Sequence, residues 1–66
     1  MNLKTEREKR GLIQIDLARA MGMTRPAYAR IESGKERKPT NQQAKAFKNA
    51  MMLYDLGKWV EVMKGT

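Results

Sequence analysis

The chain contains neither cysteine nor histidine. Disulfide bonds and thiolate sites are therefore excluded, and a zinc or imidazole-based site has almost no ligands left. The same absence removes most nucleophile–base pairs, and the seven acidic residues are scattered among basic ones instead of paired in an apolar setting. We therefore expect no metal, no cofactor and no enzymatic activity.

Long hydrophobic runs are also missing. The N-terminal residues "MNLKTEREKR" carry mixed charges where a signal peptide would need an apolar segment, and no apolar run approaches the length of a membrane span. We therefore expect a soluble, cytoplasmic protein that does not contact a membrane.

Negative charge is scarce relative to positive charge. The chain has 14 lysines and arginines against seven acidic residues, which gives a net charge of +7 and a pI near 10.2. This balance favours a polyanionic partner, most often nucleic acid. The alternative is a charged surface that only keeps the protein in solution.

β-branched residues are sparse, and alternation of apolar and polar residues never persists beyond a few positions, so the sequence predicts an all-α fold. Apolar residues recur instead at three- to four-residue spacing, which predicts a compact bundle of about five short helices. The first three helices are expected over residues 3–10, 14–21 and 25–33, and each is followed by a glycine that can end a helix.

Two further helices are predicted in the second half of the chain. Pro39 and Thr40 indicate the start of the fourth helix, in which Ala44, Phe47 and Met51 recur at helical spacing. The six methionines are interpreted as adaptable core filler rather than as a recognition surface.

The fifth helix is expected over residues 55–63. The stretch "MMLYDLGK" either continues the fourth helix or breaks near Gly57. The apolar stripe of this last helix consists of Leu56, Trp59, Val60 and Met63.

The third predicted helix has two different faces. Ala27, Tyr28 and Ile31 form a face suited to packing, and Thr24 stands where a helix N-cap is expected. Tyr28 is interpreted as a core residue rather than as a base-stacking one. The opposite face combines small residues with arginine: Arg25, Pro26, Ala29, Arg30 and Ser33.

The stretch "QIDLARAMGMTRPAYARIESGK" resembles the phage repressor and Cro type of helix-turn-helix, also called the XRE family. The similarity rests on Gln14 at the start of the second helix, Leu17–Ala18 within it, Gly22 in the turn, and Ile31–Glu32–x–Gly34–Lys35 at the end of the third. It extends from about Leu3 to Pro39. The resemblance implies a lambda-repressor-like domain, and we expect residues 1–66 to form a single helix-turn-helix DNA-binding domain without an effector domain.

The resemblance implies that the third helix lies in the major groove of DNA. It assigns base contacts to Arg25, Pro26, Ala29 and Arg30. Arginine can bind guanine bidentately, and the two small residues can only contact a thymine methyl group. For either arginine, a phosphate contact is the alternative.

Contacts to the DNA backbone are also implied by the resemblance. For Gln14 the alternative is an ordinary exposed residue near the helix start, and for the basic loop after the third helix it is a solvated run of charge. The expected backbone contacts are Gln14, Thr24, Ser33, Lys35, Arg37 and Lys38.

Two family features concern stability. The resemblance implies that Arg7 pairs with Glu32 and fixes the third helix against the first. Ile13 stands where the family usually has Ser, Thr or Asn, which removes a capping interaction of about 1 kcal/mol.

The resemblance implies a Cro-like phage or plasmid repressor in the bacterial or phage-infected cell, which binds a palindromic DNA operator as a homodimer. The alternative is an antitoxin that binds a toxin and its own promoter. Binding to RNA through charge alone has no motif to support it. Trp59, Val60 and Met63 form either the dimer surface or part of the domain's own core.

Overall fold

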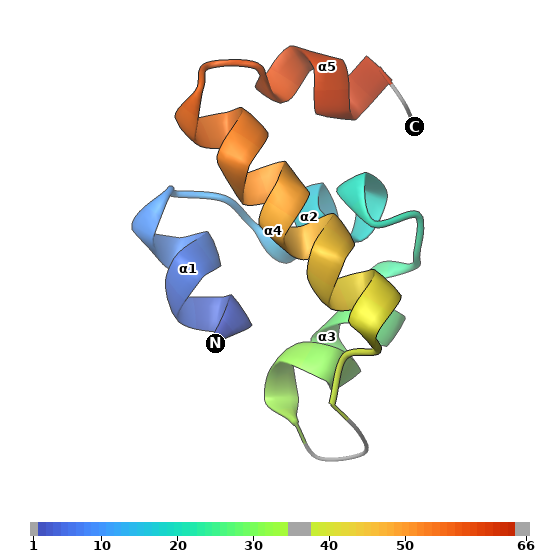
Figure 1. Cartoon of the computed structure of the whole chain (residues 1–66). Coiled ribbons are helices and arrows are strands. Elements are labelled where there is room, and N and C mark those ends of the chain that lie inside the picture. Colours follow the sequence, from blue (N-terminus) through green and yellow to red (C-terminus); the bar gives the residue numbers. More distant parts are fainter. Residues whose placement is uncertain (1, 35–37, 65–66) are drawn as a thin grey trace.

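The computed structural model describes residues 2–34 and 38–64, which form five helices and, within those residues, no strand. Figure 1 shows α4 crossing the middle of the molecule, with α5 lying across its C-terminal end. The all-α bundle expected from the sequence is confirmed. The helices are α1 (Leu3–Lys9), α2 (Gln14–Ala20), α3 (Arg25–Ser33), α4 (Asn41–Asp55) and α5 (Trp59–Lys64).

The starts of α1, α3 and α4 are fixed by polar side chains that accept hydrogen bonds from backbone N–H groups. Asn2 accepts from Thr5 N at 3.0 Å and begins α1. Thr40 and Gln43 form a reciprocal capping box at the start of α4, with bonds of 3.1 and 2.9 Å. Pro39 and Thr40 therefore indicated the correct start of this helix.

Ile13 leaves the start of α2 without a side-chain acceptor, as the sequence predicted. Half of a capping box remains, because Asp16 Oδ2 accepts a hydrogen bond from Ile13 N at 3.1 Å. One of the N–H groups at this helix start is therefore still satisfied.

The core lies between α2, α3 and α4, and α1 packs on its side. Leu17, Tyr28 and Phe47 are the largest fully buried side chains. The packing faces predicted for α3 and α4 are confirmed. The other buried apolar residues are Leu3, Leu12, Ala18, Ile31, Ala50 and Met51.

The prediction for the last helix is wrong at its start. Asp55 ends α4, Leu56 caps it, and Gly57 adopts a left-handed φ of 75° before α5 begins at Trp59. The break near Gly57, one of the two alternatives, is the correct one. The first two helices each end one residue earlier than predicted.

The apolar stripe predicted for the last helix is also only half correct. Trp59 packs against the core and meets Tyr54 edge-on, with ring centroids 5.8 Å apart. Leu56 and Val60, by contrast, are 62% and 66% exposed. The break at Gly57 changes the direction of the chain, so helical spacing counted across it no longer marks a single face.

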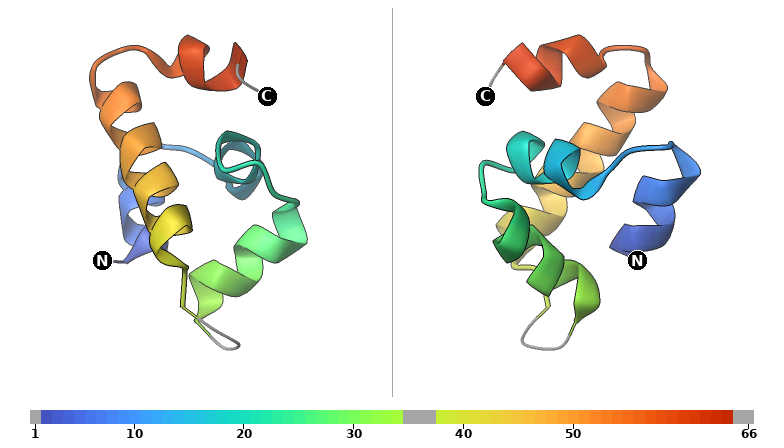
Figure 2. Two further views of the ribbon diagram at one scale, coloured as in Figure 1. Left: turned by 45° about the vertical axis from the view of Figure 1, so that its right-hand side comes forward. Right: turned by 180° about the vertical axis from the view of Figure 1, so that it is seen from behind.

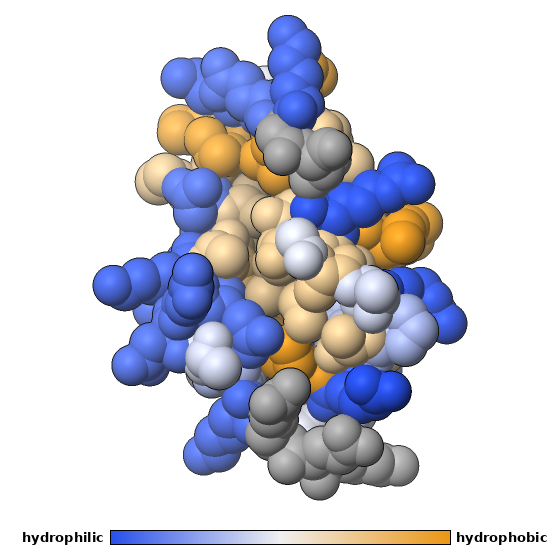
Figure 3. All heavy atoms as spheres, turned by 90° about the vertical axis from the view of Figure 1, so that its right-hand side faces the viewer, coloured by the Kyte–Doolittle hydropathy of each residue, from blue (hydrophilic) through white to orange (hydrophobic). Residues whose placement is uncertain are grey.

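The methionines do not all fill the core. Met51 is buried, and Met21 and Met23 pack against the core, but Met52 is 52% exposed. A hollow between α2, α4 and α5 is lined by residues that include Met21, Ala46 and Ala50. Figure 3 shows apolar surface at the centre of that side of the molecule and hydrophilic surface around it.

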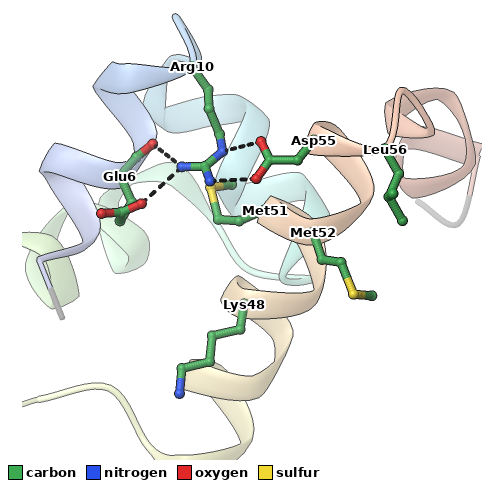
Figure 4. A pocket seen from close by; sticks show the side chains of 7 residues that line it. All are labelled: Glu6, Arg10, Lys48, Met51, Met52, Asp55 and Leu56. Carbon is green, nitrogen blue, oxygen red and sulfur yellow. Dashed lines mark hydrogen bonds and ion pairs between the residues drawn. The ribbon is translucent and has the colours of Figure 1, made fainter.

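An ion-pair cluster ties the end of α1 to the end of α4. Arg10 donates to both carboxylate oxygens of Asp55 at 2.8 Å and to Glu6 Oε1 at 3.1 Å, as Figure 4 shows. Tyr54 Oη donates to the carbonyl of Arg10 at 2.9 Å. These hydrogen bonds lower the pKa of Asp55 and raise that of Arg10.

No helix among the described residues is long and apolar enough to cross a membrane.

Candidate DNA-binding surface

The turn between α2 and α3 sets the angle between the two helices. Gly22 adopts φ = 68°, a left-handed conformation that glycine reaches without strain, and Met23 N donates to Ala18 O at 2.9 Å. Thr24 then begins α3, since its hydroxyl accepts a hydrogen bond from Ala27 N at 3.3 Å. Seen from behind, α2 and α3 lie in front of α4 (Figure 2).

The two faces predicted for α3 are present. Tyr28 and Ile31 are buried against the core, and burial raises the pKa of Tyr28. Arg25, Pro26 and Arg30 are exposed, and Ala29 is half-buried. The inner face therefore fixes α3 on the domain, and the outer face presents the guanidinium groups to solvent.

The side chain of Gln14 connects the two ends of α3. Its Oε1 accepts a hydrogen bond from Arg25 Nη1 at 2.9 Å, and its Nε2 donates to Glu32 Oε1 at 3.3 Å. Neither contact was predicted from the sequence, because the three residues are far apart in the chain and no spacing pattern relates them. Gln14 keeps one amide N–H for the phosphate contact predicted for it.

Arg7 and Glu32 form the predicted ion pair, near the C-terminal end of α3. Arg7 Nε and Nη2 donate to the two oxygens of Glu32 at 3.0 and 2.9 Å, and Nη1 donates to the carbonyl of Leu12 at 2.8 Å. The two side chains are only 10% and 5% exposed. This bidentate pair joins α1 to α3 across the bundle.

The pKa of Glu32 reflects two opposing effects. Burial favours the neutral acid, but hydrogen bonds from Arg7 and Gln14 favour the carboxylate and lower the pKa. Hydrogen bonding to Glu32 also raises the pKa of Arg7. Both groups are therefore charged at neutral pH.

The remaining residues predicted to contact the DNA backbone lie at the ends of α3. Thr24 and Ser33 are exposed, and Ser33 Oγ donates to the Arg30 carbonyl at 2.9 Å. Lys38 is exposed just before α4. Lys35 and Arg37 lie outside the described residues.

A comparison with protein families identifies this arrangement. The family model described as helix-turn-helix matches residues 3–50, which is most of the chain. The chain therefore belongs to the helix-turn-helix family of the XRE type. It is a DNA-binding transcription regulator of that kind. Neither the search of curated proteins nor that of solved structures finds a match.

Proposed function

We propose that the protein is a Cro-like repressor that binds a palindromic operator as a homodimer, with α3 of each copy in the major groove. The observation that carries this proposal is the contrast between the two faces of α3. Buried Tyr28 and Ile31 fix one face, while Arg25 and Arg30 are exposed on the other. A rigid helix with exposed guanidinium groups suits bidentate hydrogen bonding to guanine.

In the proposed complex, Arg25 and Arg30 contact guanines, and Pro26 and Ala29 contact thymine methyl groups. Gln14 holds Arg25 from α2 and so limits the directions in which its guanidinium can point. A restrained guanidinium loses less conformational freedom on binding, which favours the base contact.

The backbone contacts surround this set of bases in the proposed complex. Gln14, Thr24, Ser33 and Lys38 approach phosphates on both sides of the groove, and Lys35 and Arg37, which precede Lys38 in the sequence, are proposed to do the same. The net charge of +7 supports binding to a polyanion. Such a protein acts in the cytoplasm of a bacterial or phage-infected cell, by occupying an operator and excluding polymerase or a competing repressor.

The test is a selection from random duplex DNA with the purified protein. The best sequence and a scrambled one are then titrated over a series of salt concentrations. We expect an inverted repeat that binds at least about a thousandfold more tightly than the scrambled duplex. Equal, steeply salt-dependent binding to both duplexes would contradict the proposal.

The Arg30→Ala variant, carried through the same selection, is the matched control. If Arg30 contacts a base, the variant selects a sequence that is degenerate at one position of each half-site. A stable partner protein that co-purifies with the chain, without an enriched inverted repeat, would instead support an antitoxin.

A further inference from the structure

One side of α4 carries exposed apolar side chains that the core leaves uncovered. Met52 is 52% exposed and Leu56 is 62% exposed, whereas the neighbouring Met51 is buried. Lys48, Met52 and Leu56 follow one another at four-residue spacing, so they share a helix face. Figure 4 shows these side chains along α4, beside the Arg10 cluster. We call Lys48, Met52, Asp55 and Leu56 the α4 stripe.

The charges of the α4 stripe lie on either side of its apolar centre. Exposed Lys48 precedes Met52 by about one turn and Asp55 follows it by about one turn, so the two charges are separated by about 10 Å along the axis. Asp55 binds Arg10 with both oxygens, yet its side chain remains 52% exposed. A carboxylate has four acceptor positions, so Asp55 can accept a further hydrogen bond.

We propose that the α4 stripe binds the α4 stripe of a second copy of this chain, with the two helices antiparallel about a two-fold axis near Met52. In this arrangement the two Met52 side chains meet at the centre, and Lys48 of each copy lies level with Leu56 of the other. Asp55 of the other copy is then only about 1.5 Å further along the axis, within reach of the lysine side chain. The same patch serves both copies, as in any two-fold interface. A parallel arrangement would instead place Lys48 against Lys48 and Asp55 against Asp55.

The α4 stripe is distinct from the DNA-binding surface. Its residues belong to α4 and its cap, on the side opposite buried Phe47 and Ala50, and α2 and α3 pack on the core side of α4. Pairing through the stripe therefore leaves α3 uncovered in both copies, and each copy can bind its own DNA segment. Pairing through the α4 stripe needs no DNA and does not depend on the proposed operator.

The first test measures self-association without DNA by sedimentation equilibrium, from micromolar to millimolar protein. We expect a weak dimer, since one helix face is smaller than the roughly 800 Å² per partner of a standard interface. Met52→Lys should weaken association at least about tenfold, because it places two unpaired positive charges at the centre. Wild-type protein that stays monomeric throughout would overturn the proposal.

Ile13→Lys is the matched control. Ile13 is 59% exposed, close to the value for Met52, but it lies at the start of α2. We expect this variant to associate as the wild type does. If both variants weakened self-association equally, the effect would come from net charge alone, and this would contradict pairing through the α4 stripe.

The second test uses the absence of cysteine from the chain, because any cysteine introduced is then the only thiol. Lys48→Cys mixed with Leu56→Cys should form a disulfide between the two variants on mild oxidation. Lys48→Cys alone should not, since the two residues are then about 12 Å apart along the axis, beyond the roughly 7 Å limit between the Cα atoms of a disulfide. Efficient self-linking of Lys48→Cys would overturn the antiparallel arrangement.

The outcomes separate this inference from the proposed function. Both tests are performed without DNA. A protein that is monomeric in them but still selects an inverted repeat would therefore overturn only the proposed pairing through the α4 stripe. A protein that pairs through α4 but shows no sequence preference would overturn only the proposed operator binding.

Discussion

The residues on the outer face of α3 differ in how the domain holds them. Arg25 donates a hydrogen bond to Gln14, which in turn donates to Glu32, and Glu32 is bound by Arg7. A single chain of contacts thus runs from the buried Arg7 of α1 to the first residue of α3. Arg30 lies one and a half turns further along α3, and Lys38 lies in the loop beyond it.

Arg30 and Lys38 should respond differently to truncation. We expect Arg30→Ala to cost about 1–3 kcal/mol of binding free energy and to relax preference at one base position, because a base contact is lost. Lys38→Ala should weaken binding to all sequences alike and reduce the salt slope by about one unit, because a phosphate contact is lost. Titrations against the selected and scrambled duplexes check both. A uniform loss with Arg30→Ala would identify it as a phosphate contact.

The Arg7–Glu32 pair makes stability depend on pH. The pKa of Glu32 is lowered in the folded state, so its contribution is fully present above the unfolded value of about 4.3 and is lost as pH falls through the lower folded value. Urea unfolding from pH 7 to pH 3 should therefore show a smaller loss of stability in Glu32→Gln than in the wild type. Equal losses in the two proteins would remove this role of Glu32.

Truncating the other partner provides a second measurement of the same pair. Arg7→Ala leaves the Glu32 carboxylate buried without its main donor, which should cost about 3–5 kcal/mol of stability at neutral pH. Thermal unfolding measures this loss. An unchanged melting temperature would contradict a structural role for the pair.

At the scale of the element, the turn from α2 to α3 depends on backbone conformation more than on packing. A Cβ atom at Gly22 would meet nothing within 4 Å, so space is not the constraint. The φ of 68° is the constraint, because L-residues other than Asn and Asp rarely adopt it.

Gly22→Ala should therefore destabilise the domain by about 1–2 kcal/mol. Gly22→Asn is the matched control and should cost less, because asparagine tolerates the left-handed region. Chemical denaturation of the two variants checks the difference. If the two variants proved equally stable, the left-handed conformation of residue 22 would not be the cause of the destabilisation.

At the scale of the whole molecule, contacts between distant segments hold the bundle together. Arg10 at the end of α1 binds Asp55 at the end of α4, and the domain measures 32 × 22 × 20 Å. Because no dimension of the domain exceeds 32 Å, two copies have room to lie about one helical turn apart on one face of a duplex. The proposed homodimer therefore predicts two half-sites one helical turn apart, about 34–36 Å between centres.

Hydroxyl-radical footprinting on the selected duplex measures this spacing. We expect two protected patches related by a two-fold axis and separated by one turn. A duplex that carries only one half-site is the control and should show a single patch with weaker binding. One asymmetric patch on the full site would contradict the homodimer.

Local signals in the sequence predicted most of the fold. Thr24, Thr40 and the glycines marked the helix ends, and apolar spacing identified Tyr28 and Phe47 as core residues. These features depend on neighbours within about four residues, which is the range of helix hydrogen bonds and caps. The exposed residues of α3 were predicted for the same reason.

The sequence by itself therefore determined the all-α class, the helix-turn-helix and the two faces of α3. Only the tertiary structure decided that Gln14 joins Arg25 to Glu32, that Arg10 binds Asp55, and which apolar residues near Gly57 stay exposed. The physical reason is the distance along the chain over which each kind of interaction acts. Propensity, capping and periodicity act over one helical turn, whereas these contacts depend on where separate helices come to lie after packing.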